Sequence, residues 1–222
     1  MRWKLQRDRL HAAIAVLAAV ALYTLLPARL TIGPIWVAPA LVLVILVPLL
    51  IAGSRTGNQT IGQRAAAITL VAIVNFFNVA SVILLVYDLV SSGHHSINGV
   101  QLLIAGSQIW LTNVIVFSLW FWELDGDGPT PRAKAACARD FRNADFLFPQ
   151  MNANPEHVTW TPPDWKPQFL DYFYLAFTNA TAFSPTDVMP LSRMAKMLML
   201  IQASISLVTI ALILARSVNI IA

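Results

Sequence analysis

Uncharged and mostly apolar stretches alternate with short charged segments along the whole chain. A transmembrane helix needs about 20 apolar residues, because about 30 Å of hydrocarbon is crossed at 1.5 Å per residue. Five stretches meet this length, with 19 uncharged residues between Arg9 and Arg29, 25 between Arg29 and Arg55, 23 between Arg64 and Asp88, 34 between Asp88 and Glu123, and 19 between Lys196 and Arg216. The pattern therefore predicts five transmembrane helices.

A sixth apolar stretch is shorter. Asp171 and Asp187 enclose 15 uncharged residues, which would form a helix of only about 22 Å. This length favours a re-entrant segment, with a sixth span as the alternative. We therefore expect an all-α integral membrane helical bundle in three regions: a four-span membrane region at 1–124, a polar extramembrane loop or cap at 125–166, and a pore-helix-like segment followed by the last transmembrane helix at 167–222.

Composition supports this environment and narrows the function. The chain is 57% hydrophobic and 12% charged, which is too little charge to cover a water-soluble domain of this size. The spacing of acidic residues in ELDGDG resembles the start of a calcium loop, but Lys134 takes the place of the final glutamate. No nucleotide-binding or hydrolase motif is present. We predict no enzyme, cofactor or metal site and no nucleic-acid partner.

The distribution of basic residues predicts the orientation. Cytoplasmic loops of membrane proteins carry an excess of Lys and Arg. With the N-terminus in the cytoplasm and the 15-residue stretch re-entrant, thirteen of the fifteen Lys and Arg residues lie on that side, and twelve do so if the stretch spans. We expect a multi-pass protein of the plasma (inner) membrane with a cytoplasmic N-terminus, whereas the side of the C-terminus stays open.

Polar side chains recur at helical spacing inside three predicted spans. They are Asn75 and Asn78 in the third, Gln108 and Asn113 in the fourth, and Gln202 in the last. One interpretation is a polar pathway for ions or a small solute. The other is interhelical hydrogen bonding, which is the commoner use of amides and hydroxyls in membranes.

The segment FLDYFYLAFTNATAFSPTDVMPLSRMAKMLMLIQ carries a family resemblance. Its aromatic run, Thr178, Thr181, Asp187 and Pro190 follow the order found in the pore segment of the tetrameric, potassium-channel-like cation-channel superfamily. The segment also resembles a group of uncharacterised bacterial multi-pass membrane proteins. The resemblance covers about 50 residues and implies a homo-oligomer, with a tetramer favoured, and a permeating cation.

The chain departs from that family at the selectivity filter. The corresponding residues, 182–186, contain no glycine and include Pro185, whose φ is fixed near −65°. A potassium filter needs backbone freedom that glycine supplies, so the resemblance implies a degenerate, glycine-free filter. The lining would then come from polar side chains: Thr178, Asn179, Thr181, Ser184 and Thr186, with Asp187 as a charged ring at one mouth.

Two functional hypotheses follow, together with a structural alternative for the segment itself. The first is a channel-like membrane protein that passes cations or small solutes. The second is a non-conducting membrane scaffold whose loop at 125–166 docks a partner. In the structural alternative, residues 168–187 form a short tilted helix that packs the bundle, and Ser184 to Asp187 cap the last span.

Overall fold

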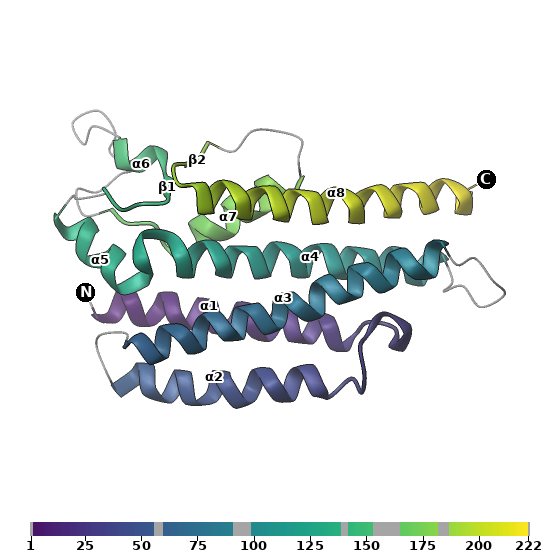
Figure 1. Cartoon of the computed structure of the whole chain (residues 1–222), viewed down its shortest axis with the longest axis horizontal. Coiled ribbons are helices and arrows are strands. Elements are labelled where there is room, and N and C mark those ends of the chain that lie inside the picture. The colour runs from purple at the N-terminus through teal and green to yellow at the C-terminus, as the bar shows by residue number, and fades with distance from the viewer. Residues whose placement is uncertain are drawn as a thin grey trace.

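Long helices run side by side along one axis of the molecule (Figure 1). The computed structural model describes residues 2–55, 60–90, 99–138, 142–152, 165–181 and 187–221. The long helices are α1 (Arg2–Thr24), α2 (Val37–Arg55), α3 (Ile61–Val90), α4 (Gly99–Leu124) and α8 (Arg193–Ile221), and a 3-10 turn, η1 (Ala28–Leu30), lies between α1 and α2. This architecture confirms the predicted all-α class.

Within the described ranges, three helices are long and apolar enough, by length and composition, to cross a membrane. They cover Ile61–Val90, Val100–Asp127 and Arg193–Ala215, which correspond to the third, fourth and last predicted spans. The apolar parts of α1 and α2, Arg9–Thr24 and Val37–Ala52, are shorter than 18 residues. The described helices thus indicate a membrane location, with three of the five predicted spans at full length.

The beginnings of two long helices carry local capping signals. The backbone N–H of Gln63 donates to Thr60 Oγ1 (3.3 Å), and Gln63 Oε1 accepts from the Thr60 N–H (3.0 Å). This reciprocal capping box starts α3. At the start of α8, the N–H of Ala195 donates to Ser192 Oγ (3.1 Å), so Ser192 caps the last helix. Of the segment from Ser184 to Asp187, the structure describes only Asp187.

Helix α4 is the centre of the bundle and packs against α1, α3, α7 and α8. Its apolar side chains Val114, Val116, Phe117 and Phe121 are buried. Gly106 permits the close approach of α8, because a Cβ atom at this position would lie 2.6 Å from Ile213 Cγ1. By contrast, only 17% of the most apolar part of α8 is buried, against 67% of the corresponding part of α4. Helix α8 therefore lies at the edge of the bundle.

The polar region forms a small cap at the end of the bundle where the N-terminus lies (Figure 1). It contains η2 (Asp125–Asp127), α5 (Pro129–Ala138), β1 (Phe146–Leu147) and α6 (Pro149–Asn152). Strand β1 pairs antiparallel with β2 (Met189–Pro190), with Phe146 opposite Pro190. Because β2 directly precedes α8, this pairing ties the start of the last helix to the cap.

Most of the 15-residue stretch lies in α7 (Phe169–Thr181), which begins at the cap and lies beside α4 and α8 (Figure 1). Tyr172, in its first turns, packs against Phe146 of β1. At its other end, Ala180 accepts a hydrogen bond from Ser206, which is about 20 Å along α8 from Arg193. Helix α7 therefore ends near the middle of the bundle, and by β2 the chain is back at the cap.

Candidate functional site

Two clusters of buried and half-buried polar side chains hold the two ends of α7. The cap cluster comprises Asp125, Arg132, Asp145 and Tyr172. The mid-bundle cluster comprises Trp110, Asn113, Asn179, Gln202 and Ser206. Together they fix where the short helix begins, how deep it reaches and which face it turns to α4 and α8.

The cap cluster is centred on Asp125, which is fully buried. The chain reverses here because Gly126 has a φ of 55°, a conformation that glycine adopts at little cost. Asp125 Oδ1 accepts hydrogen bonds from the backbone N–H groups of Asp145 (2.7 Å) and Phe146 (3.3 Å), and Oδ2 accepts one from the phenol of Tyr172. These donors compensate a carboxylate that has lost its water.

Arg132 supplies the positive charge of the cap cluster. Its Nη1 donates to the carbonyl oxygens of Trp122 (2.9 Å) and Asp125 (2.7 Å) and lies 4.0 Å from Asp125 Oδ2. The guanidinium also lies 4.8 Å from the ring centroid of Tyr172, within the range of a cation–π contact. Burial raises the pKa of the Tyr172 phenol well above its usual value, so the phenol stays neutral and remains a donor.

The mid-bundle cluster joins α7 to α8 through two amide side chains. Asn179 Nδ2 donates to the Met199 carbonyl (2.9 Å) and to Gln202 Oε1 (2.8 Å), and Gln202 Nε2 donates back to the Ala176 carbonyl (2.8 Å). From α4, Asn113 Nδ2 donates to the Gln202 carbonyl (3.3 Å). Both Asn113 and Gln202 are fully buried. One glutamine on α8 therefore connects three helices.

Ser206 makes a second connection one turn deeper. Its hydroxyl accepts from Trp110 Nε1 (2.7 Å) on α4 and donates to the Ala180 carbonyl (2.5 Å) on α7. The Trp110 ring also packs edge-on against Phe177 at 5.6 Å between centroids. Since a free carbonyl at a helix end is costly away from water, this bond stabilises the inner end of α7.

The predicted pore-lining residues have different surroundings. The hydroxyls of Thr178 and Thr181 donate to carbonyls of α7 itself, at 2.9–3.0 Å, whereas Asn179 turns toward α8. Ser184 and Thr186 lie outside the described residues. Asp187 is exposed at the cap end, immediately before the buried Val188. Among the described pore-lining residues, only Asn179 is hydrogen-bonded to another predicted residue, Gln202.

Three further polar residues predicted within the membrane lie on α3 and α4: Asn75, Asn78 and Gln108. Asn78 is buried and Asn75 and Gln108 are half-buried. Within the described part of the chain, Asn75 Oδ1, Asn78 Nδ2, Gln108 Oε1 and Asn113 Oδ1 have no hydrogen-bond partner. On α4, Asn113 Nδ2 is therefore bonded to α8, whereas Asn113 Oδ1 and Gln108 Oε1 can still accept hydrogen bonds.

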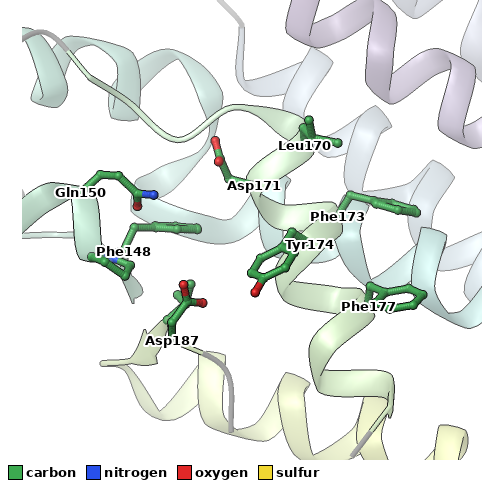
Figure 2. Close-up of a pocket in the computed structure, with 10 residues that line it drawn as sticks. Phe148, Gln150, Leu170, Asp171, Phe173, Tyr174, Phe177 and Asp187 are labelled. Atoms are coloured by element: carbon green, nitrogen blue, oxygen red, sulfur yellow. The ribbon is translucent and has the colours of Figure 1, made fainter. Parts of the chain in front are cut away.

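A groove of about 580 Å³ borders the outer face of α7. Figure 2 shows Tyr174 projecting from α7 toward Phe148 and Asp187, while the rings of Phe173 and Phe177 project to the other side of the same helix. Asp171 from the first turn of α7 also lines it. The groove thus combines aromatic walls with two carboxylates.

The cap cluster was missed from the sequence. Asp125 stands in the stretch that resembles a calcium loop, yet no group of three or more potential metal ligands occurs among the described residues. Its partners Arg132, Asp145 and Tyr172 lie 7, 20 and 47 positions away. The only sequence signal is an aspartate between a span and a glycine, which is also typical of an ordinary helix end.

Known proteins give no guide to the function of this chain. No protein-family model, no curated protein and no solved structure matches this chain.

Proposed function

We propose that the chain is a homo-oligomeric, channel-like membrane protein that passes cations or small solutes without a conventional potassium-selective filter. The observation that carries this proposal is the placement of α7. A short helix ends near the middle of the bundle and is held at both ends beside α8. In the proposed topology α7 is re-entrant, five helices span the membrane, and the N-terminus is cytoplasmic.

The positions of the chain segments support this topology. The N-terminus, the cap and the start of α8 lie at the same end of the bundle (Figure 1), and most basic residues belong to these segments. The positive-inside rule places such an end in the cytoplasm. The shorter apolar parts of α1 and α2 fit this arrangement because a bilayer adapts to a short span at modest cost.

The direction of α7 supports a cation as the permeating species. Its carboxyl end, at Thr181, points into the bundle, and such an end carries a partial negative charge of about half an elementary charge. In an oligomer several of these ends would face a shared path. Thr178, Thr181, Ser184 and Thr186 would line it, Asp187 would form the charged mouth, and Asn179 would position α7.

The outer surface of α8 supports oligomer formation. Its exposed side chains are large and apolar, including Met197, Leu200, Leu207 and Leu214. Lipid covers part of such a surface, and a neighbouring copy covers the rest in the proposed assembly. A tetramer is the favoured state because the pore-like segment resembles that of tetrameric channels.

Flux measurements and oligomeric state test the proposal together. Purified protein in liposomes should pass K⁺, Na⁺ or a small neutral solute above the level of empty vesicles, and light scattering in detergent should give an oligomer. Asp187→Asn should change the flux, whereas Asp127→Asn, a matched exposed carboxylate at the turn after α4, should not. A monomer, or no flux of any of these species, would refute the channel.

A second candidate function is a non-conducting membrane scaffold whose region at 125–166 docks a partner. One observation favours it: Asn113, Asn179, Gln202 and Ser206 are used in hydrogen bonds between helices, which is a structural use of polar side chains. Normal oligomers without flux, combined with saturable binding of a partner to that region, would favour the scaffold over the channel.

A further inference from the structure

We propose that the groove beside α7 binds a cationic amphiphile, a molecule with a substituted ammonium head and one short apolar tail. This binding site does not depend on conduction. Its volume of about 580 Å³ lies in the range of pockets that hold small organic ligands, about 300–1,000 Å³.

The apolar walls account for the tail. Phe173 and Phe177 come from α7, and Phe148 comes from the segment after β1. Leu170 and Tyr174, which also border the groove, are more than half exposed. Phe148 is buried against Trp165 and Tyr172, whereas Leu170, Tyr174 and Phe177 are exposed along α7. An extended apolar tail can therefore cover the exposed apolar side chains along α7.

The charges account for the head. Asp171 and Asp187 line the groove, and among the described residues that line it none is basic. Asp171 is held in place because its Oδ2 accepts the N–H of Gln168 at 2.7 Å. The exposed aromatic face of Tyr174 also attracts cations. This combination favours an ammonium group and disfavours fatty acids and anionic lipids.

The order of these groups along α7 matches the shape of an amphiphile. Asp171 lies in the first turn of α7, and Asp187 directly precedes Val188 and β2 at the cap. Phe177 lies about 9 Å farther into the bundle than Asp171. The carboxylates are therefore near the cap end and Phe177 lies deeper, so the head would stay near the proposed membrane surface while the tail follows α7 inward.

Calorimetry on the full chain in a nonionic detergent tests the proposal, with empty micelles as the blank. The probes are hexyltrimethylammonium, hexanol and hexyl sulfate. We expect saturable binding of hexyltrimethylammonium only. Asp187→Asn should weaken it by about fivefold, since one of the two carboxylates that line the groove loses its charge in a partly exposed site, and Asp127→Asn should leave it unchanged.

Tyr174→Leu provides a second test, because it keeps an apolar side chain and removes the aromatic face. It should also weaken hexyltrimethylammonium binding while circular dichroism and the elution volume stay as in the wild type. Equal binding of hexyl sulfate, or equal affinities for the wild type, Asp187→Asn and Tyr174→Leu, would overturn the proposal. Neither result depends on liposome flux, so failure of the channel and failure of this site are distinguishable.

Discussion

The phenol of Tyr172 on α7 donates a hydrogen bond to the carboxylate of Asp125 at the turn after α4. Both residues are fully buried, and 47 positions of the chain separate them. The bond therefore fixes the start of the short helix to the end of the central helix. Loss of this bond should cost much folding free energy, because a buried carboxylate that loses a donor cannot replace it with water.

Tyr172→Phe should accordingly lower the free energy of unfolding by about 1–3 kcal/mol. The substitution keeps the ring that packs against Phe146 and Phe148 and removes only the hydroxyl. Denaturant unfolding in mild detergent, followed by circular dichroism, measures the change. Tyr174→Phe on the exposed side of the same helix is the control and should change stability by less than about 0.5 kcal/mol. Equal losses for both variants would contradict the assignment.

Arg132→Met should destabilise the fold by about 3 kcal/mol, because it leaves Asp125 as a buried carboxylate without its cation. Arg132→Lys should recover only part of this loss. An ammonium can replace the one nitrogen, Nη1, that donates to both carbonyls, but it has no planar guanidinium to lie over the Tyr172 ring. The comparison is Arg64→Met, which breaks a partly exposed ion pair with Asp127 at 3.6 Å and should cost less than about 1 kcal/mol. A similar melting temperature for Arg132→Met and Arg64→Met would argue against the buried pair.

Gln202→Leu should loosen α7 without unfolding the bundle. The variant removes both side-chain bonds between Gln202 and α7 while keeping the backbone carbonyl that Asn113 contacts. Hydrogen–deuterium exchange should speed up in residues 169–181 by about tenfold, as expected for a loss of about 1.4 kcal/mol, and stay unchanged in α3. Ser204→Ala is the control, because that hydroxyl bonds only to Leu200 of its own helix. Unchanged exchange in α7 would show that Gln202 does not hold the helix.

Gly106→Ala should destabilise the contact between α4 and α8 by about 1–3 kcal/mol, because the new methyl group would overlap Ile213. Gly62→Ala has open space around its Cβ position and should leave stability unchanged or slightly higher. Combining Gly106→Ala with Ile213→Ala should restore part of the loss in thermal unfolding. If the double variant is no more stable than Gly106→Ala alone, the clash is not the cause.

Cysteine labelling should place both ends of the short segment on one membrane face. Single cysteines at Leu170 and Met189, both exposed, are introduced into a Cys137→Ser background. A membrane-impermeant maleimide should label both from the cytoplasmic side of inverted vesicles, because α7 starts at the cap and β2 returns to it. Labelling from opposite faces would establish six spans and refute the re-entrant topology.

The sequence predicts the short helix well and the cap poorly, for different physical reasons. A charge gap reports directly on how many residues can lie in hydrocarbon, so the limits Asp171 and Asp187 enclose most of α7, which covers Phe169–Thr181. The polar residues Asn113 and Gln202 are likewise visible from helical spacing, and interhelical bonding is one of their two expected uses. The cap depends on contacts between Asp125, Arg132 and Tyr172 that no periodicity encodes, because they come from a turn, a surface helix and a buried helix face.

The position of α7 also determines when it can form during synthesis. Its partners Met199, Gln202 and Ser206 follow it in the chain, so they leave the ribosome after it. A helix of 13 residues is marginal on its own in water. The carbonyls of Ala176 and Ala180 receive their hydrogen bonds from Gln202 and Ser206 only once α8 is present. We therefore expect α7 to take up its final position against α4 and α8 only after the last helix has been made. Truncation within α8 would leave α7 without its inner anchor even though every residue of α7 is present.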